Sequence, residues 1–406
     1  MKITKKSWLA INPTVFYSPK NAEFLLYNTN NGKYILSSNT KLKEIIDRMH
    51  EKHALGVIEI SDEEINNSDI LDIINDAIEK NILRLIDKEL FPQKPVQLMP
   101  VLNLQKDVER LGERDKRLLA ANVGNYLYSL VLHINSNCNK TCTHCNNYHK
   151  QFLYCTQSSS NNQMDWQLVE HILREIDKTS VKVIKIVGGN IFLYDNFEKL
   201  LELFKQTQLD LEFYVDFYNY CEANRDLLND FEKHILLHFP IDSNKNFCNI
   251  QSNEHFHFVV SSIEEYEYAE NIIQDKSMQN YTVHPFYDGK NIDFFKENVF
   301  ITTDDILSDK IAQKTIFANQ KLNTNFFGEL HILPEGTVLT SPNVQSVGNI
   351  KDSSLLELIY KEMLENTAWR KIRNETPCSN CTYQFLCPPI STYELALNKT
   401  SLCTIK

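Results

Sequence analysis

Alternating apolar and polar positions divide the middle of the chain, residues 125–310, into strands and helices. Six short apolar segments are typical of strands, namely 127–134, 181–187, 209–215, 234–239, 255–260 and 281–286. Helical spacing of apolar residues follows most of them, as in 164–176. This alternation predicts a parallel sheet covered by helices. Six strands are too few for the usual eight-stranded closed barrel, so we expect an α/β fold with a partial (β/α)6 barrel of the TIM type.

The N-terminal residues, 1–90, have the pattern of a small separate α/β module. Strand patterns cover 14–18 and 23–27, and a third strand follows a turn at Asn31-Gly32. Asn-Gly is a strong short-range hairpin signal. Isoleucines at helical spacing then predict a helix over 68–80.

Two further regions complete the chain. Three prolines between residues 91 and 100 exclude a helix there, so residues 91–124 are predicted to be a linker. Residues 325–406 carry a hairpin pattern at 326–341, a helical pattern at 354–365 and a cysteine-rich end. We therefore expect three domains joined by one long linker.

Composition narrows the possible partners. The 406 residues carry a formal charge of −11, which disfavours nucleic acid and anionic lipid because phosphate binding needs a basic surface. We find no apolar run of about 18 residues for a transmembrane helix and no apolar segment typical of a signal peptide. The expected location is the cytoplasm, where thiols stay reduced and clustered cysteines bind metal or do chemistry.

The first cysteine group follows directly on the first predicted strand of the middle region. Cys138, Cys142 and Cys145 have the spacing C-x3-C-x2-C. A structural zinc site needs four ligands, but Cys155 is ten residues further on and His144 is cramped between two of the three. Three thiolates on a [4Fe-4S] cluster leave one iron open to bind a substrate or cofactor. The spacing and its position therefore favour a cluster over zinc.

This motif after the first strand of a six-unit (β/α) region resembles the radical S-adenosylmethionine (SAM) superfamily. The resemblance implies that the three cysteines hold a [4Fe-4S] cluster whose fourth iron binds SAM. Reductive cleavage of SAM then gives a 5′-deoxyadenosyl radical that abstracts a substrate hydrogen. The family has a Gly-Gly-Glu-like stretch after the second strand, whose backbone contacts the methionyl amine of SAM. Here Gly188, Gly189 and Asn190 occupy that position, so the resemblance implies that they bind the cofactor.

A second cysteine group lies in the tail. Cys378, Cys381, Cys387 and Cys403 can saturate either a tetrahedral zinc or a [4Fe-4S] cluster. Together with the first group, this tail resembles the SPASM/twitch-like extension of radical SAM peptide maturases. The four cysteines match every ligand of the outer auxiliary cluster in that family. Ser391 stands where a ligand of the inner cluster belongs, so the resemblance implies one auxiliary [4Fe-4S] cluster.

The element order of residues 1–90 resembles a RiPP recognition element, a winged-helix-like domain of enzymes that modify ribosomally made peptides. There a precursor's leader peptide adds as a strand to a sheet edge. A winged helix used for dimerisation or folding support is the alternative. The whole chain is similar to SPASM peptide maturases, most of all to proteins of Bacteroidales peptide systems. The resemblance implies a radical SAM enzyme that modifies a precursor peptide, with a flavodoxin or ferredoxin as reductant.

A second interpretation follows from three departures from the family pattern. Asn190 replaces an acid, Asn146 stands where an aromatic is common, and Pro240 stands where relatives often have serine. Some relatives, the pseudo-radical SAM proteins, have lost their SAM cluster. The alternative is therefore a catalytically silent, leader-binding partner of a second maturase subunit. The survival of all three cysteines of the first group favours the enzyme.

The other cysteines and a histidine pair have less specific interpretations. Cys221 and Cys248 are predicted to be small buried residues. Cys155 is close in sequence to the first group, but a structural role is favoured. His255 and His257 alternate on one strand face, where a core or surface pair is favoured over a pair of metal ligands.

Overall fold

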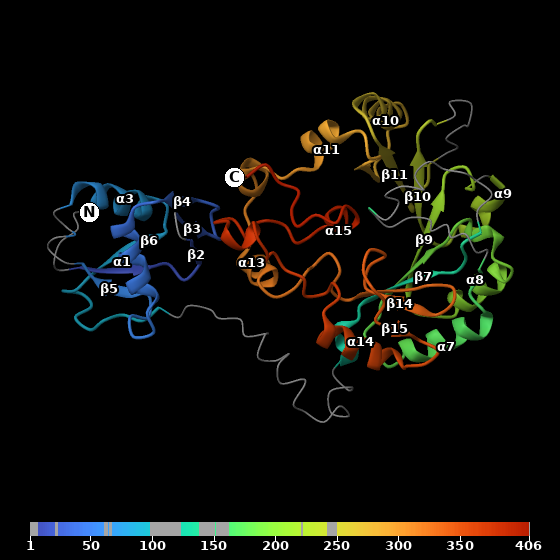
Figure 1. Cartoon of the computed structure of the whole chain (residues 1–406), viewed down its shortest axis with the longest axis horizontal. Coiled ribbons are helices and arrows are strands. Elements are labelled where there is room, and N and C mark those ends of the chain that lie inside the picture. The colour runs from blue at the N-terminus through green and yellow to red at the C-terminus, as the bar shows by residue number, and fades with distance from the viewer. Residues whose placement is uncertain are drawn as a thin grey trace.

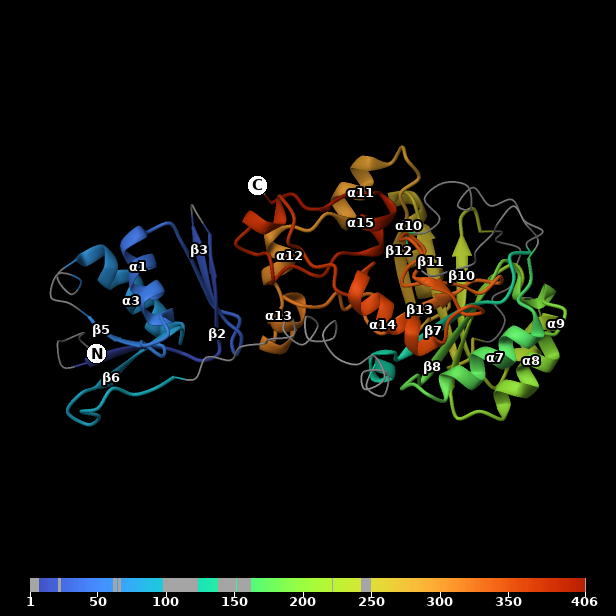
Figure 2. The same ribbon diagram turned by 60° about the horizontal axis from the view of Figure 1, so that its bottom comes forward.

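The computed structural model describes residues 7–20, 23–60, 64, 67–97, 123–137, 151, 162–220, 222–241 and 250–405. An N-terminal module with two small sheets lies at one end of an elongated molecule (Figure 1). A nine-stranded sheet with its helices lies at the other end, and the C-terminal segment lies between them, as Figure 2 also shows. The predicted domain boundaries agree in outline with this arrangement but stay predictions.

All six strands predicted in the middle region form. They are β7 (Ser129–His133), β8 (Val183–Val187), β9 (Asp210–Asp216), β10 (Glu232–His238), β11 (Glu254–Val260) and β12 (Tyr281–Pro285). They lie side by side in the order β12-β11-β10-β9-β8-β7, and every neighbouring pair is parallel. The predicted α/β fold with a parallel sheet is confirmed, while its closure into a partial barrel stays a prediction.

The sheet continues beyond β7 into the C-terminal region. The added strands are β13 (Glu329–Ile332), β14 (Thr337–Leu339) and β15 (Gly348–Asn349). β13 pairs with β7 in parallel, and β14 and β15 follow as antiparallel neighbours. The predicted hairpin of the C-terminal region is therefore part of the central sheet.

One face of this sheet carries the main hydrophobic core. η1 (Gly124–Tyr126) precedes β7. The elements between the strands from β7 to β12 are α7 (Trp166–Ile176), η3 (Ile191–Leu193), α8 (Phe197–Lys205), α9 (Glu222–Arg225), η4 (Asp226–Leu228) and α10 (Ile263–Asp275). Alternate strand residues such as Leu132, Phe213 and Leu237 pack with apolar residues of α7 and α8. Burying this face is the main favourable contribution to folding of the region.

The opposite face of the sheet is mixed. Val131, Val187, Tyr214 and Leu236 form a small apolar cluster there. Polar side chains occupy other positions of the same strands, and several are hydrogen-bonded to one another across strands. Parallel strands buried on both faces are normally apolar throughout, so the polar residues of this face set it apart from an ordinary core.

The N-terminal module contains two three-stranded antiparallel sheets. They are formed by β1 (Ser7–Ile11), β5 (Val57–Glu59) and β6 (Leu83–Asp87), and by β2 (Val15–Pro19), β3 (Phe24–Asn28) and β4 (Tyr34–Ser37). Helices α1 (Thr40–His50) and α3 (Ser68–Glu79) begin after the capping side chains of Asn39 and Asn67. The Asn31-Gly32 turn joins β3 to β4 as predicted, with Gly32 at φ +74°. The sequence pattern missed β1, a fully buried strand.

The remaining elements connect the sheet to the module. They are α11 (Ile292–Val299), α12 (Thr303–Leu307), α13 (Gln313–Asn319), α14 (Leu355–Glu365), η5 (Cys378–Asn380) and α15 (Thr392–Ala396). Leu25 and Tyr27 of β3 share a hydrophobic cluster with Ile316 of α13 and with Tyr383 and Leu386. The module thus packs directly on the cysteine-rich segment.

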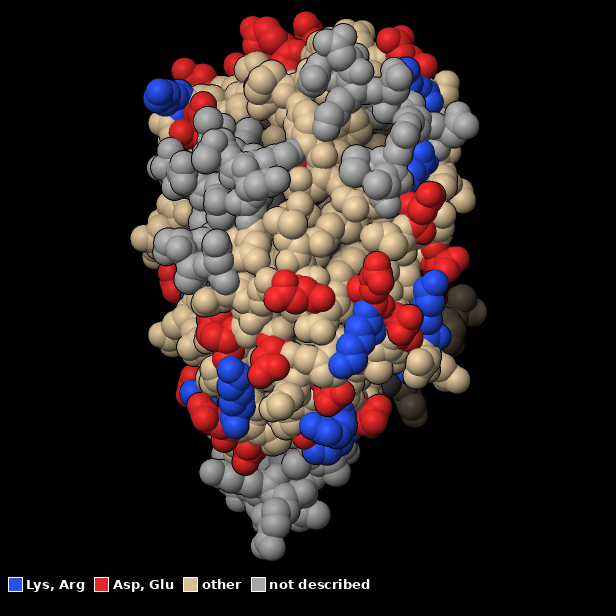
Figure 3. All heavy atoms as spheres, turned by 90° about the vertical axis from the view of Figure 1, so that its right-hand side faces the viewer, with Lys and Arg blue, Asp and Glu red and all other residues tan. Residues whose placement is uncertain are grey.

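The surface has no dominant charge on the face that lies at the right of Figure 1. Figure 3 shows acidic and basic side chains interspersed there, without a continuous basic patch among the described residues. None of the helices in the described part of the chain has the length and apolar character needed to span a bilayer.

Candidate functional site

The segment that leads into the first cysteine group lies at the C-terminal end of β7. Cys138, Cys142 and Cys145 themselves lie outside the described residues. Asn135 forms an isolated bridge with Gln163, and the Ser136 N–H donates to the Asn162 carbonyl at 2.9 Å. Open α/β sheets build their ligand sites at this edge, so the structure positions the chain before Cys138 where a site is expected.

Gly188 and Gly189 hold this segment from the end of β8. A Cβ atom on Gly188 would lie 2.6 Å from the Asn135 Oδ1, and one on Gly189 would lie 2.2 Å from the Asn137 carbonyl oxygen. The Gly189 N–H donates to the Asn135 Oδ1 at 3.1 Å. Only glycine allows this approach of two backbones. The pair predicted to bind SAM therefore also fixes the residues immediately before Cys138.

Asn190, the third predicted cofactor residue, is buried and hydrogen-bonded. Its side chain accepts from the Phe192 N–H at 3.1 Å and so caps η3. Its own N–H donates to the Asn137 carbonyl at 2.5 Å, and its carbonyl accepts from the Asn135 side chain at 2.8 Å. An amide in place of the family's acid thus has a structural function as an N-cap.

Two buried polar atoms at the same edge of the sheet lack a partner among the described residues. They are the Asn137 Oδ1, just before Cys138, and the Asn219 Nδ2, just beyond β9. Buried polar atoms are almost always hydrogen-bonded. This edge therefore offers an acceptor and a donor to a polar ligand, which fits the amino and carboxylate groups of a bound amino-acid-like cofactor.

The four predicted tail cysteines come together in space. Cys378, Cys381, Cys387 and Cys403 all line one cavity of about 590 Å³, and all four are free thiols. Cys378 begins η5, while Cys403 bridges to Ile301 in the segment before α12. The assignment of these four residues as one ligand group stays a prediction.

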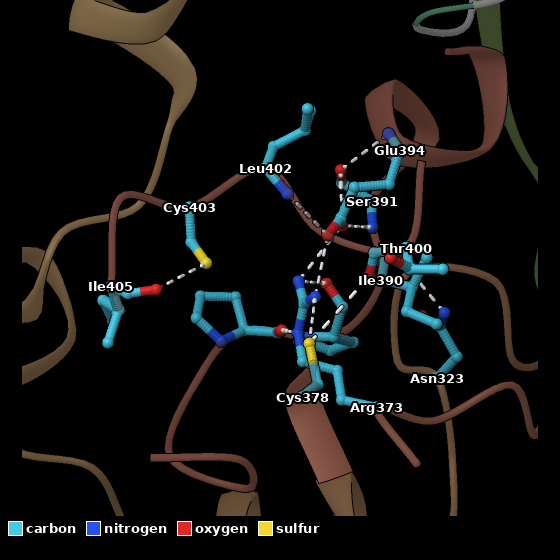
Figure 4. Close-up of polar contacts among 12 residues, drawn as sticks. Asn323, Arg373, Cys378, Ile390, Ser391, Glu394, Thr400, Leu402, Cys403 and Ile405 are labelled. Carbon is cyan, nitrogen blue, oxygen red and sulfur yellow. Dashed lines mark hydrogen bonds and ion pairs between the residues drawn. The ribbon is translucent and has the colours of Figure 1, made fainter. Parts of the chain in front are cut away.

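A buried ion pair holds the two parts of the tail together (Figure 4). The Arg373 Nη1 lies 2.7 Å from the Glu394 Oε1, and the two side chains are 4% and 2% exposed. Arg373 also donates to the Pro388 carbonyl at 2.6 Å and lies 3.9 Å from the Cys378 sulfur. The pair therefore places a cation beside the thiols and ties η5 to α15.

Ser391, the position where the inner-cluster ligand is missing, has a separate function. It is the N-cap of α15, and its hydroxyl and the Glu394 carboxylate form a reciprocal capping box. Glu394 therefore caps a helix and neutralises Arg373 at once.

Burial controls the ionisation of the tail thiols. It raises the pKa of Cys387 to about 12 although Arg373 lowers it, and it also raises the pKa of Cys381. In the metal-free chain both thiols are protonated at neutral pH, so metal binding would release protons. Among the described residues, no three His, Cys, Asp or Glu side chains are grouped closely enough to hold one metal ion as they stand.

A row of histidines crosses the mixed face of the central sheet, and sequence reasoning found only part of it. His257 of β11 contacts His234 of β10 and His284 of β12, each through ring nitrogens 2.8 Å apart. His133 of β7 and His331 of β13 form a similar pair at 3.1 Å. Burial, helped by neighbouring imidazoles, lowers the pKa of His257 to about 2. Burial is also the main reason why the pKa values of His234 and His284 fall to about 4. His234, His257 and His284 are therefore neutral at pH 7.

The sequence feature that could have predicted this row is the alternation of histidine with apolar residues in neighbouring strands. His255 and His257 were predicted to be a core or surface pair, and the structure places both on the mixed face, stacked 4.5 Å apart. Four other residues that the sequence singled out lie outside the described residues, namely Asn146, Cys155, Cys221 and Cys248. Pro240 is described, and its carbonyl accepts a hydrogen bond from the Tyr218 hydroxyl at 2.9 Å.

Taken together, the fold and the site define an α/β protein with a parallel sheet, a candidate cofactor site at its C-terminal edge and a separate four-cysteine cavity. Residues 132–244 match the family model of the Radical SAM superfamily. A domain of this superfamily implies a [4Fe-4S] cluster and SAM. No curated protein matches the chain.

Several solved structures are similar to it, among them the following three. Streptococcus suis SuiB bound to the precursor peptide SuiA has 12% identity and a TM-score of 0.45, covering 98% of this chain and 99% of that chain. SuiB bound to S-adenosylmethionine has 13% identity, the same coverage and a TM-score of 0.45. Hexahistidine-tagged anSMEcpe with bound AdoMet has 15% identity and a TM-score of 0.42, covering 68% of this chain and 92% of that chain. At these TM-scores the similarities carry no argument about function.

Proposed function

We propose that the protein is a radical SAM enzyme that binds a ribosomally synthesised precursor peptide through residues 1–90 and modifies it by radical chemistry. The family match over 132–244 supports the reaction class. The observation that carries the peptide part is an edge strand, β4, that borders a groove in the N-terminal module. Residues 1–90 act in this proposal as a recognition element, and the tail acts as a SPASM-like extension.

The groove fits an added peptide strand. β4 pairs only with β3 among the described strands, so its other edge carries main-chain groups that a peptide can pair with. A groove of about 820 Å³ lies between β4 and α3. Tyr34 and Leu36 of β4 are 38% and 40% exposed, whereas Ile35 between them is buried. These two side chains would contact alternate residues of the peptide.

The residues at the end of β7 and β8 fit the implied cofactors. Cys138, Cys142 and Cys145 would hold the cluster, and SAM, when bound there, supplies an organic radical through one-electron cleavage. The Gly188–Asn190 backbone would line the SAM site and keep the Asn135–Asn137 segment in place. Asn137 Oδ1 and Asn219 Nδ2 would orient polar groups of the cofactor.

The four tail cysteines would hold one auxiliary [4Fe-4S] cluster. Four thiolates around one zinc lie about 3.8 Å apart, as tetrahedral bonds of about 2.3 Å require. Four thiolates on a cubane bind four different irons and stand further apart. The shared cavity of about 590 Å³ leaves room for a cubane among the four cysteines, which supports the cluster.

The first test of the enzyme is SAM cleavage. The full-length protein is reconstituted anaerobically with iron and sulfide, and 5′-deoxyadenosine is measured after dithionite and SAM are added. We expect cleavage in the parent protein, and in the Cys138→Ala variant we expect the loss of about four irons and of all cleavage. A protein that binds the iron of both clusters and produces no 5′-deoxyadenosine would contradict the proposal.

The catalytically silent partner remains the second candidate, and the position of Asn190 favours testing it. Its side-chain oxygen caps η3, so the side chain has a structural role that needs no contact with SAM. The Asn190→Asp variant keeps the cap and restores an acid. Cleavage that occurs in this variant and not in the parent would identify a SAM site that has lost its activity. Equal cleavage in both would exclude the silent partner.

A further inference from the structure

The four-cysteine cavity has a wall that comes from the other end of the sequence. Glu23, at the start of β3, is among the residues that line it. Lys20, just after β2, reaches the same loop. Its Nζ donates to the Ser379 carbonyl at 2.7 Å and to the Gln384 Oε1 at 2.7 Å. Both acceptors lie between Cys378 and Cys387, so one lysine fixes the loop that carries three of the four thiols.

Lys20 is also connected to the cation already described beside the thiols. Gln384, which accepts from Lys20, donates through its Nε2 to the Arg373 carbonyl at 2.5 Å. Arg373 in turn contacts the Cys378 sulfur at 3.9 Å. Two cations, one from each end of the chain, are therefore connected to the loop that carries the sulfurs.

The packing around Lys20 holds it in this place. Leu25 and Tyr27 of β3 pack on Tyr383 and Leu386 of the cysteine loop. The Tyr27 hydroxyl accepts from the Ile311 N–H at 2.9 Å. A second polar contact between the same bodies, from the Gln313 Nε2 to the Pro13 carbonyl at 3.0 Å, involves no cysteine-loop residue. Lys20 therefore belongs to a packed interface between the N-terminal module and the C-terminal region.

We propose that Lys20 of the N-terminal module is a positioning residue for the four-cysteine centre, and that it fixes the ligand loop and raises the reduction potential of the bound cluster. The inference rests on the proposed auxiliary centre. Hydrogen bonds and charges around the ligands set the affinity and potential of such sites. A cation next to the cluster favours its more negative, reduced state. The module would then serve the metal site in addition to binding a peptide.

The experiment isolates the tail centre. Full-length protein with Cys138, Cys142 and Cys145 all replaced by alanine is reconstituted with iron and sulfide, so that SAM cleavage does not enter the measurement. In this background Lys20→Met is compared with the conservative Lys20→Arg and with Gln313→Ala, which breaks the second interface contact. The midpoint potential and the rate of iron release to a chelator are measured for each.

We expect Lys20→Met to lower the midpoint potential and to release iron about tenfold faster. Lys20→Arg should stay within about twofold of the parent, because it keeps the charge. Gln313→Ala should leave both values unchanged. If Lys20→Met matches the parent, or if Gln313→Ala has the same effect as Lys20→Met, the inference is overturned and the contact serves docking alone.

Failure of the underlying centre gives a different result. A parent background that binds no metal would overturn the four-cysteine centre and this inference with it. A background that binds zinc would overturn the cluster, and with it the effect on potential. Whether Lys20 positions the loop would then be tested by the zinc release rate in the same three variants. Neither outcome depends on whether the full enzyme cleaves SAM.

Discussion

The two predicted cysteine sites are held in different ways. At the end of β7, backbone contacts hold the chain, because Gly188 and Gly189 leave no room for a side chain against Asn135 and Asn137. In the tail, side-chain charges hold it, because the Arg373–Glu394 pair joins η5 to α15. The first site is therefore sensitive to volume and the second to charge. The first two predictions that follow test this difference, and the third concerns the central sheet.

Removal of the buried cation should have the largest effect. Arg373→Met leaves the Glu394 carboxylate buried without its partner, which costs about 3–5 kcal/mol of unfolding free energy. The exposed pair Lys296–Asp293, with side chains 51% and 88% exposed, is the control. Lys296→Met should change stability by no more than about 0.5 kcal/mol. Denaturant unfolding measures the free energy of unfolding of both variants. If both lose the same small amount of stability, the buried pair does not hold the tail.

A single methyl group should disturb the other site. Gly189→Ala forces a Cβ against the Asn137 carbonyl and should cost about 1–3 kcal/mol. It should also displace the segment before Cys138 and reduce the iron bound there. Gly32→Asn is the control, since Gly32 has a positive φ but no atom closer than 3.7 Å to an added Cβ. Iron content together with thermal unfolding measures both effects. A Gly189→Ala variant with full iron content would contradict the backbone interpretation.

The histidine row should make stability depend on pH in a defined window. The pKa values of His234 and His284 fall to about 4 in the fold, below the usual value of about 6.5. As pH falls below 6.5, the unfolded chain takes up protons first, so the stabilisation present above that pH is progressively lost down to about 4. We expect a loss of about 1–2 kcal/mol for the coupled row.

A matched pair of variants tests the assignment of this window to the row. His257→Asn removes one of three buried imidazoles and should reduce the pH dependence of the melting temperature between 6.5 and 4. His53→Asn changes a side chain that is 82% exposed and should leave the slope as it is. An unchanged slope in His257→Asn would mean that the row does not produce it.

Much of the fold could be predicted because local pattern and tertiary structure agree. The six parallel strands and the Asn31-Gly32 hairpin are examples, since alternation and turn chemistry are local properties. β1 was missed because its four apolar residues after Ser7 do not alternate with polar ones and so give no amphipathic strand pattern. The tail cysteines were predicted as a group from spacing and family resemblance, but their partners were not. Lys20 contacts the cysteine loop at Ser379, which is 359 residues away in the sequence. Arg373 is only 5 residues from Cys378. No sequence pattern links either cation to the cysteines.

The pairing of β13 with β7 has a consequence for synthesis of the protein. β7 has β8 on one side and a strand that begins only at Glu329 on the other. Until that part of the chain has left the ribosome, β7 is an edge with unpaired main-chain groups, open to association with other chains. The domain therefore completes its sheet late in translation. A product that stops before residue 329 should be prone to aggregation even though it contains the whole segment that matches the family.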